Sequence, residues 1–223
     1  MVPLLLSAAA LASPLNPWGS ATGEDTALIN PYLYVYPDGV NPILYGAVGL
    51  ADAVDVYFGA GTFIAPGGPA TSALELFPRF FVDPSVALSP HLYWTPGSDT
   101  VIVAPEVHVN HSWSRFAIVA NAGWRPVLGG TDGFSAGTVP VIVAPELRLA
   151  ERYSMYVELD PTFALDGGDV AMIVVPGFGA ALDASGRHAV SVGLQIPVLP
   201  EVGPASLGAF YCVVFPSGGE GSE

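Results

Sequence analysis

The sequence predicts an all-β protein, in the form of an up-and-down antiparallel transmembrane β-barrel of about 12 strands. Hydropathy alternates with a period of two residues from Ile29 onward, which is typical of strands and not of helices. The 26 glycines and 22 prolines interrupt the apolar runs, so that none after the first dozen residues approaches the length a membrane-spanning helix needs. Tight and longer connections also alternate along the chain, as at the two ends of a barrel.

Composition and charge exclude several classes of protein. With 51% hydrophobic and only 12% charged residues, the 223-residue chain is not disordered. Its 20 acidic residues outnumber the 6 basic ones and give a net charge of -14. Because nucleic-acid binding requires clustered cations, we expect no nucleic-acid partner. The one cysteine, Cys212, cannot form an internal disulfide, and we expect it to be buried and structural.

The N-terminal residues have the features of a secretory signal peptide. An apolar stretch from Val2 is closed by Ala10-Leu11-Ala12, a pattern of small residues at which signal peptidase cuts. The alternative is an uncleaved hydrophobic N-terminus. We therefore predict a signal peptide at 1–12, a periplasmic stretch at 13–28, the barrel at 29–215 and an acidic flexible tail at 216–223.

Strands are expected wherever one parity of the sequence is apolar and the other is mixed. In the third such segment, for example, Val54, Val56 and Phe58 alternate with Asp55 and Tyr57. No charged residue falls on the apolar parity of any segment, so we expect that parity to face lipid and the other to face the lumen. The segments are 29–36, 42–50, 54–64, 73–82, 86–95, 100–109, 114–125, 138–149, 153–165, 169–182, 188–198 and 205–215.

The connections predict which end of the barrel each strand leaves. Tight turns are expected at 50–53, 82–85, 110–112, 150–152 and 183–186, and glycine-rich loops at 65–70 and 127–137. Transmembrane barrels combine short periplasmic turns with longer outer loops. The hexapeptide Val-Ile-Val-Ala-Pro-Glu occurs at 101–106 and again at 141–146, which indicates repetition of a hairpin unit.

A soluble sandwich or lipocalin-like barrel would alternate in the same way, but with its charged parity facing water. This chain contains no lysine, and its polar parity is rich in Tyr, Gly, Ala and paired acids and bases, which suits a crowded lumen. Aromatic residues near the predicted strand ends, such as Phe80, Trp94 and Trp124, are expected in interfacial girdles. The alternative is that aromatic residues simply favour strands.

Seven prolines within the predicted strands are unusual, because proline cannot donate a hydrogen bond to a neighbouring strand. All seven lie on the outward parity. Pro78 falls nearly opposite Pro90 across the Asp83-Pro84 turn, so we expect bends or bulges at matched height. The seven are Pro31, Pro78, Pro90, Pro105, Pro145, Pro161 and Pro176.

Residues 206–215, Ser-Leu-Gly-Ala-Phe-Tyr-Cys-Val-Val-Phe, alternate and end on an aromatic residue. This segment resembles the C-terminal strand signal of the bacterial outer-membrane β-barrel, or porin-like, superfamily. The resemblance covers 29–215 by pattern and identifies no specific family. It implies a bacterial outer-membrane location, contact with outer-membrane lipids, and the barrel-assembly machinery as a partner. Such strands usually end the chain, whereas residues 216–223 follow here.

The lumen parity supplies the candidate site residues. They make the lumen mildly acidic, which predicts a passive, porin-like channel for small solutes with a weak preference for cations. A non-conducting structural or adhesion barrel, with the same residues as a polar plug, is the alternative. The residues are Asp55, Glu75, Arg79, His91, Glu106, His108, Arg115, Glu146, Arg148, Glu158 and Asp160.

An outer-membrane lipid hydrolase is the third hypothesis. Ser89 and His91 share a face, and His108 with Asp55 or Glu106 could complete a serine, histidine and acid group. No Gly-x-Ser-x-Gly motif is present, so we expect no enzyme activity. We also expect no cofactor and no metal. The Asp166-Gly167-Gly168-Asp169 loop, with Asp99 and Asp132, has the oxygen ligands that Ca²⁺ prefers, but solvated turn residues are the simpler interpretation.

Overall fold

A computed structural model describes residues 22, 26–65, 71–97, 101–128, 134–184, 187–198 and 204–215. The predicted signal peptide and C-terminal tail lie outside these ranges. No helix in the described part of the chain is long and apolar enough to cross a membrane. The strands are β1 Ala27–Tyr36, β2 Gly39–Ala51, β3 Val54–Phe63, β4 Thr71–Asp83, β5 Val86–Trp94, β6 Val101–Trp113, β7 Phe116–Gly123, β8 Arg125–Leu128, β9 Phe134–Ala150, β10 Tyr153–Ala164, β11 Val170–Ala181, β12 His188–Pro197 and β13 Ser206–Phe215.

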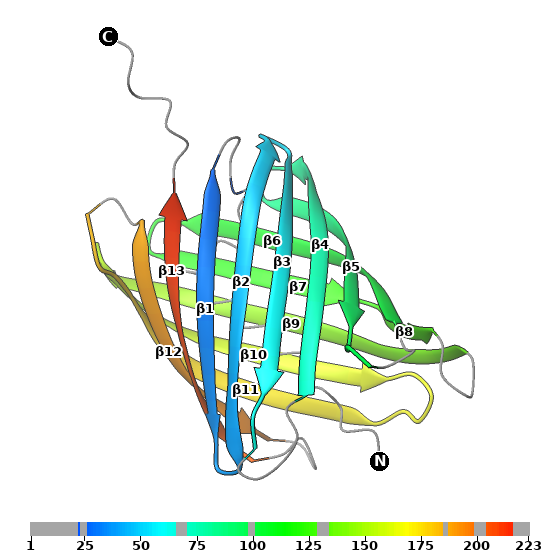
Figure 1. The fold of residues 1–223 in the computed structure, drawn as a ribbon. Coiled ribbons are helices and arrows are strands. Elements are labelled where there is room, and N and C mark those ends of the chain that lie inside the picture. Colours follow the sequence, from blue (N-terminus) through cyan, green and yellow to red (C-terminus); the bar gives the residue numbers. More distant parts are fainter. Residues whose placement is uncertain are drawn as a thin grey trace.

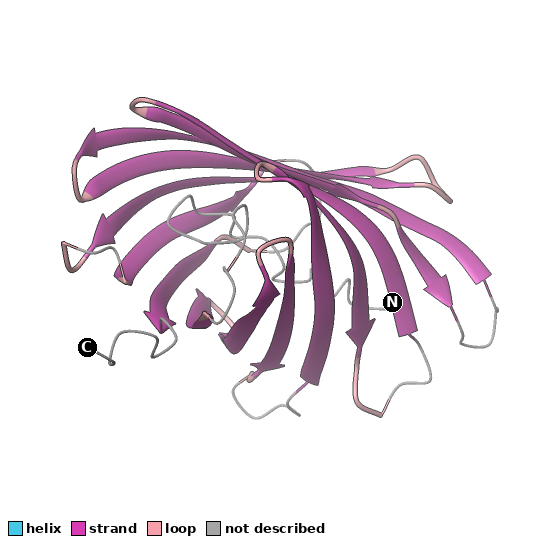
Figure 2. Cartoon of the chain, turned by 90° about the horizontal axis from the view of Figure 1, so that it is seen from above, coloured by secondary structure: helices cyan, strands magenta, loops and turns pink. Residues whose placement is uncertain are grey.

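The strands form one closed antiparallel sheet (Figures 1 and 2). Apart from β7 and β8, neighbours in sequence pair in turn. β13 pairs with β1, and β10 pairs with both β9 and β11, so the sheet has no free edge. β7 and β8 share one position between β6 and β9, because they pair with different parts of both and are separated by Trp124 alone. The barrel therefore has 12 strand positions, which confirms the predicted fold class.

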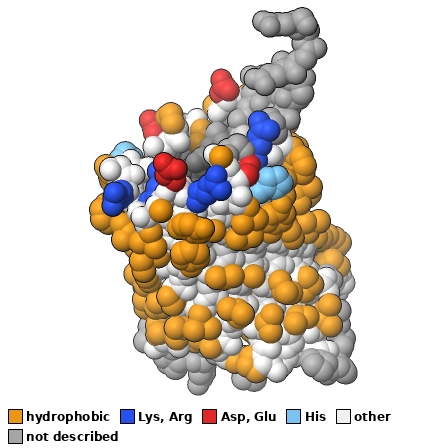
Figure 3. Space-filling view, turned by 90° about the vertical axis from the view of Figure 1, so that its left-hand side faces the viewer, with side chains coloured by type: hydrophobic (Ala, Val, Ile, Leu, Met, Phe, Trp, Pro, Cys, Tyr) orange, Lys and Arg blue, Asp and Glu red, His pale blue; other side chains and the backbone are white. Residues whose placement is uncertain are grey.

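The outer surface is apolar and the inner surface is mixed, as the alternation predicts. On β1, Ile29 and Leu33 are exposed. Asn30 and Tyr34, the next residue after each of them, are buried in the barrel. Figure 3 shows apolar side chains covering the wall, with charged side chains gathered at one end of the face in view. So much exposed apolar surface would cause aggregation in water, so this wall is suited to lipid.

Two predicted connections differ from the structure. The expected turn at 110–112 lies inside β6, which continues to Trp113; the chain reverses at Ser114 and Arg115 instead. Ser114 has a φ of 48°, a left-handed conformation that closes this tight turn. The expected loop at 127–137 is shorter, because β8 extends to Leu128 and β9 begins at Phe134. Pairing between β8 and β9 adds rungs that the hydropathy pattern does not reveal.

Aromatic side chains fill much of the interior. Tyr45 lies over Gly59, its partner in the register, and a Cβ on this glycine would come within 2.3 Å of the tyrosine ring. Tyr156 covers Gly177 on the opposite wall in the same way. Glycine at these positions leaves room for the ring on the neighbouring strand. The larger buried apolar cluster is made of Leu28, Tyr32, Tyr34, Ile43, Tyr45, Ala47, Tyr57, Phe77, Ile173, Val175 and Phe210.

Three prolines of adjacent strands lie at matched height on the outward parity. Pro90 of β5 faces Pro105 of β6 directly. On the other side, the β4–β5 pairs Leu76↔Leu92 and Phe80↔Leu88 place Pro78 opposite Pro90. The row crosses β4, β5 and β6, where each proline lacks the amide that a regular rung requires.

Candidate functional site

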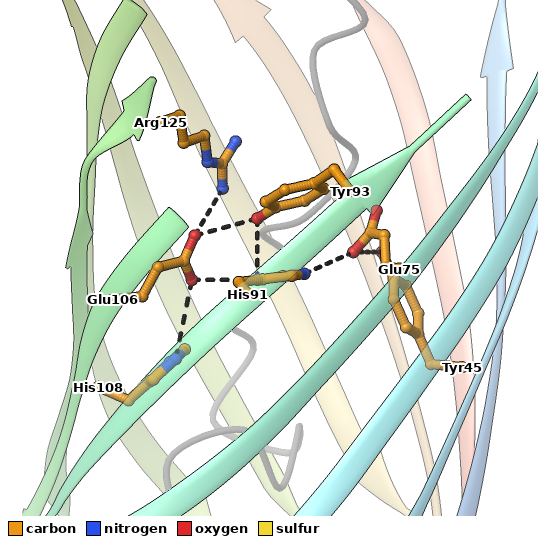
Figure 4. Close-up of polar contacts among 7 residues, drawn as sticks. All are labelled: Tyr45, Glu75, His91, Tyr93, Glu106, His108 and Arg125. Carbon is orange, nitrogen blue, oxygen red and sulfur yellow. Dashed lines mark hydrogen bonds and ion pairs between the residues drawn. The ribbon is translucent and has the colours of Figure 1, made fainter. Parts of the chain in front are cut away.

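A cluster of charged and aromatic side chains from β2, β4, β5, β6 and β8 lies in the barrel interior (Figure 4). We call it the His91 cluster; it comprises Tyr45, Glu75, His91, Tyr93, Glu106, His108 and Arg125. Strand alternation turns these side chains inward, and the register brings Glu75 beside Tyr93. The side chains of His91, Glu106 and His108 are 2%, 7% and 2% exposed, so they interact in a nearly dry environment.

His91 joins two carboxylates that come from different strands. Its Nε2 lies 3.1 Å from Glu75 Oε2, and its Nδ1 lies 3.2 Å from Glu106 Oε2. The Tyr93 hydroxyl is 2.9 Å from His91 Nδ1 and donates to Glu106 Oε1 at 3.0 Å. Tyr45 donates to Glu75 Oε2 at 3.2 Å. The imidazole therefore links β4 to β6 through a hydrogen-bonded chain.

Arg125 completes the cluster from β8. Its Nη2 donates to Glu106 Oε1 at 3.2 Å, and its guanidinium lies over the Tyr93 ring, 4.7 Å from the centroid. His108 Nε2 is 3.7 Å from Glu106 Oε2, an ion-pair distance when the histidine is protonated. Glu106 is thus the centre of the cluster, with three potentially cationic neighbours.

A cavity of about 10 Å³ adjoins the His91 cluster. That volume is room for about one water molecule. The cavity is lined by His91, Glu106, His108, Asn121 and Arg125 together with Ala122, Gly123, Pro140 and Ile142. Both His108 ring nitrogens and Asn121 Oδ1 are buried without a hydrogen-bond partner. Polar atoms with remaining hydrogen-bonding capacity therefore border this gap in the packing.

A second group, which we call the Arg79 cluster, comprises Thr22, Asp55, Tyr57 and Arg79. Asp55 of β3 and Arg79 of β4 are directly opposite in the register. Arg79 Nε donates to Asp55 Oδ1 at 2.9 Å and Nη2 donates to Oδ2 at 2.7 Å, a bidentate pair. Arg79 Nη2 also donates to the Tyr57 hydroxyl at 3.1 Å. Thr22, which precedes β1, reaches Asp55 from inside the barrel.

The remaining predicted site residues lie apart from these clusters. Glu146 is buried on β9, and Glu158 and Asp160 point inward from β10. Arg115 and Arg148 have the lumen parity but are exposed at the tight-turn end, where Arg148 N donates to Arg115 O. The structure thus brings Asp55 to Arg79 and joins Glu75, His91, Glu106 and His108, while Arg115 and Arg148 lie at the rim.

Several site residues were not among the candidates. Four of them lie on the lumen parity, so the hydropathy alternation indicates that they face inward: Tyr57, Tyr93, Asn121 and Arg125. Their contacts, however, depend on the strand register, which the alternation does not give. Thr22 lies outside every predicted strand, and nothing in the sequence pattern indicates that it enters the barrel.

The hydrolase hypothesis gains no support from the geometry. The buried Ser89 hydroxyl makes no hydrogen bond, and both His91 ring nitrogens face Glu75, Glu106 or Tyr93 instead. A serine nucleophile needs a base within hydrogen-bonding reach. In the described ranges, no group of three or more His, Cys, Asp and Glu residues is arranged to hold a metal ion.

A scan against protein-family models and a search of curated proteins both find no match for this sequence. Solved structures do match. The KdgM porin has a TM-score of 0.63 and 10% identity, over 84% of this chain and 99% of that chain. An outer membrane channel from Pseudomonas putida F1 has a TM-score of 0.63 and 12% identity, over 88% of this chain and 98% of that chain. The NanC porin has a TM-score of 0.59 and 7% identity, over 85% of this chain and 98% of that chain. These similarities show that the chain shares the closed antiparallel β-barrel fold of these channels.

Proposed function

We propose that the protein is a porin-like channel through which small solutes cross the outer membrane passively. The observation that carries this proposal is the concentration of ionisable side chains inside the barrel, above all in the His91 cluster. Charged groups at close quarters in a lumen set the selectivity of such channels. The fold shared with solved porins supports the same function.

The interior charge favours cations over anions. Among the residues that the structure describes, two interior arginines, Arg79 and Arg125, face six carboxylates, and His91 and His108 add positive charge only when protonated. The six carboxylates are Asp55, Glu75, Glu106, Glu146, Glu158 and Asp160. We therefore propose a weak preference for cations, set mainly by Glu106 beside the cavity and by Glu146.

The tight packing of the interior favours a second candidate, a structural barrel that conducts nothing. Tyr34, Tyr57, Phe77 and Arg79 are all 0% exposed. Side chains packed to this degree leave a narrow path at most, so the channel hypothesis requires small solutes and a low conductance.

Planar-bilayer recording distinguishes the two candidates. We expect the purified protein to give small, discrete conductance steps. Because Glu106→Gln and Glu146→Gln each remove one interior negative charge, both should lower the ratio of cation to anion permeability. Glu151→Gln is the matched control, since Glu151 is exposed in the β9–β10 turn and should leave the ratio unchanged. Bilayers that stay silent with folded protein would favour the structural barrel.

Membrane insertion is a separate part of the proposal. Outer-membrane lipids surround the apolar wall, and we propose that the barrel-assembly machinery recognises β13, which ends at Phe215. Phe215→Ala should lower the fraction of heat-modifiable, folded barrel on gels. An unchanged fraction would contradict recognition through this aromatic residue. Cleavage of a signal peptide after Ala12 stays a prediction, and the N-terminal sequence of the mature protein would test it.

A further inference from the structure

Thr22, which precedes β1 in the sequence, lies in the barrel interior. Thr26 O accepts a hydrogen bond from Gly49 N, which fixes the chain at the tight-turn end of the wall just before β1 begins. Thr22, four positions earlier, contacts Asp55 and Tyr57, whose side chains point inward and are 0% exposed. Thr22 therefore lies within the lumen rather than outside it.

The contacts of Thr22 define a polar site with specific geometry. Its backbone N and its Oγ1 both donate to Asp55 Oδ2, each at 2.9 Å. Its Oγ1 also lies 3.5 Å from the Tyr57 hydroxyl. The nitrogen and the hydroxyl of threonine are carried by adjacent carbon atoms. One carboxylate oxygen thus accepts from an N–H and an O–H on adjacent carbon atoms, which is the donor spacing of a 1,2-amino alcohol.

Arg79 holds the Asp55 carboxylate in the orientation and with the charge balance that suit a neutral or singly charged donor pair. Its two hydrogen bonds hold the plane of the Asp55 carboxylate and balance its charge. The Arg79 guanidinium itself lies over the Tyr57 ring, 4.3 Å from the centroid. With the charge balanced and the side chains fixed, hydrogen-bond geometry rather than net charge decides what binds.

We propose that Asp55, Tyr57 and Arg79 form a solute-binding site of the channel, that Thr22 occupies it in place of solute, and that the solute carries a 1,2-amino alcohol or vicinal diol. The inference rests on the proposed channel function. Because Thr22 is tethered four residues before the wall, its effective concentration at the site is on the order of millimolar or higher. A solute must therefore be abundant to displace it.

Calorimetric titration of the full chain in detergent micelles tests the inference. The probe is 1-amino-2-propanol, and its isomer 3-amino-1-propanol is the matched control, since its donors are one carbon further apart. We expect the first isomer to bind a few-fold more tightly, because the second must freeze one more rotatable bond to bring both donors to one carboxylate oxygen.

Three variants separate competition from simple damage to the site. Thr22→Val removes the hydroxyl donor of the internal competitor, so the 1,2-isomer should bind up to about tenfold more tightly. Thr22→Ser keeps that donor and should behave as the wild type. Thr162→Val, a lumen-facing threonine on β10 outside the Arg79 cluster, should also leave binding unchanged. Heat modifiability on gels verifies that each variant is folded.

Each outcome is decisive. Equal binding of the two isomers, no binding in any folded variant, or no effect of Thr22→Val would overturn the inference. Conduction that is insensitive to Thr22→Val and to the 1,2-isomer would also overturn it, while leaving the channel function intact. Selective, Thr22-sensitive binding combined with silent bilayers would support the site and contradict the channel function.

Discussion

Replacing Arg79 by methionine should destabilise the barrel strongly. The variant removes both hydrogen bonds to Asp55, at 2.9 and 2.7 Å, and the bond to the Tyr57 hydroxyl. It also leaves the Asp55 carboxylate, which is 0% exposed, without its counter-charge. Breaking a buried ion pair from one side costs about 3–5 kcal/mol, mostly because the remaining charge stays desolvated. We expect a loss of that size in the free energy of unfolding.

Urea unfolding in detergent micelles, followed by tryptophan fluorescence, measures this loss. The double variant Arg79→Met/Asp55→Asn should lose less than Arg79→Met alone, because it buries no unpaired charge. Arg152→Met is the matched control; Arg152 is exposed in the β9–β10 turn, and its loss should change stability by less than about 0.5 kcal/mol. Two results would refute the electrostatic explanation. One is a free energy of unfolding for Arg79→Met within about 1 kcal/mol of the wild-type value. The other is a lower free energy of unfolding for the double variant than for Arg79→Met.

Three further predictions concern the wall and its loops. Leu44→Arg, at an exposed position near the middle of β2, should lower the free energy of unfolding in vesicles by about 2–4 kcal/mol, because it puts a charge into the bilayer centre. Gly177→Val should lower the urea midpoint, because even a Cβ there would approach an aromatic ring to 2.1 Å; an unchanged midpoint would contradict the packing. Hydrogen bonds from the Ser135 hydroxyl and the Gly137 amide lower the pKa of the Asp166 carboxyl in the loop after β10. Because the folded pKa is below the unfolded one, this stabilisation is complete above about pH 4 and is lost as the pH falls through the folded value. Protection of the Gly137 amide from hydrogen exchange should fall only in that acid range, and in Asp166→Asn it should lose this pH dependence.

Alternation in the sequence predicts on which side of the wall a residue lies, but not its height. Glu106 and Arg148 both have the lumen parity, yet Glu106 is buried and Arg148 is exposed at the rim. Arg148 is exposed because it lies close to the end of β9, at the rim of the barrel. How high each residue lies along the barrel axis depends on the tilt and stagger of the strands. A period of two residues carries no information about either quantity.

The sequence pattern also could not predict which side chains from different strands contact one another. Arg125 meets Glu106 because the chain is interrupted at Trp124 and β8 pairs with the distant half of β6. The hydropathy pattern instead predicts one segment that ends at Arg125 and a loop from 127 onward, where β8 lies. Thr22 has no apolar alternation around it, and its position depends on tertiary contacts with Asp55 and Tyr57.

The matched prolines Pro78, Pro90 and Pro105 have a consequence for a wall immersed in hydrocarbon. Where a β-sheet bends sharply, some rungs break, and in lipid no water is present to satisfy an amide that loses its partner. Proline carries no amide hydrogen, so a rung broken at proline leaves only a carbonyl oxygen unsatisfied. Curvature can thus be concentrated in β4, β5 and β6 at a lower energetic penalty than other residues would impose there.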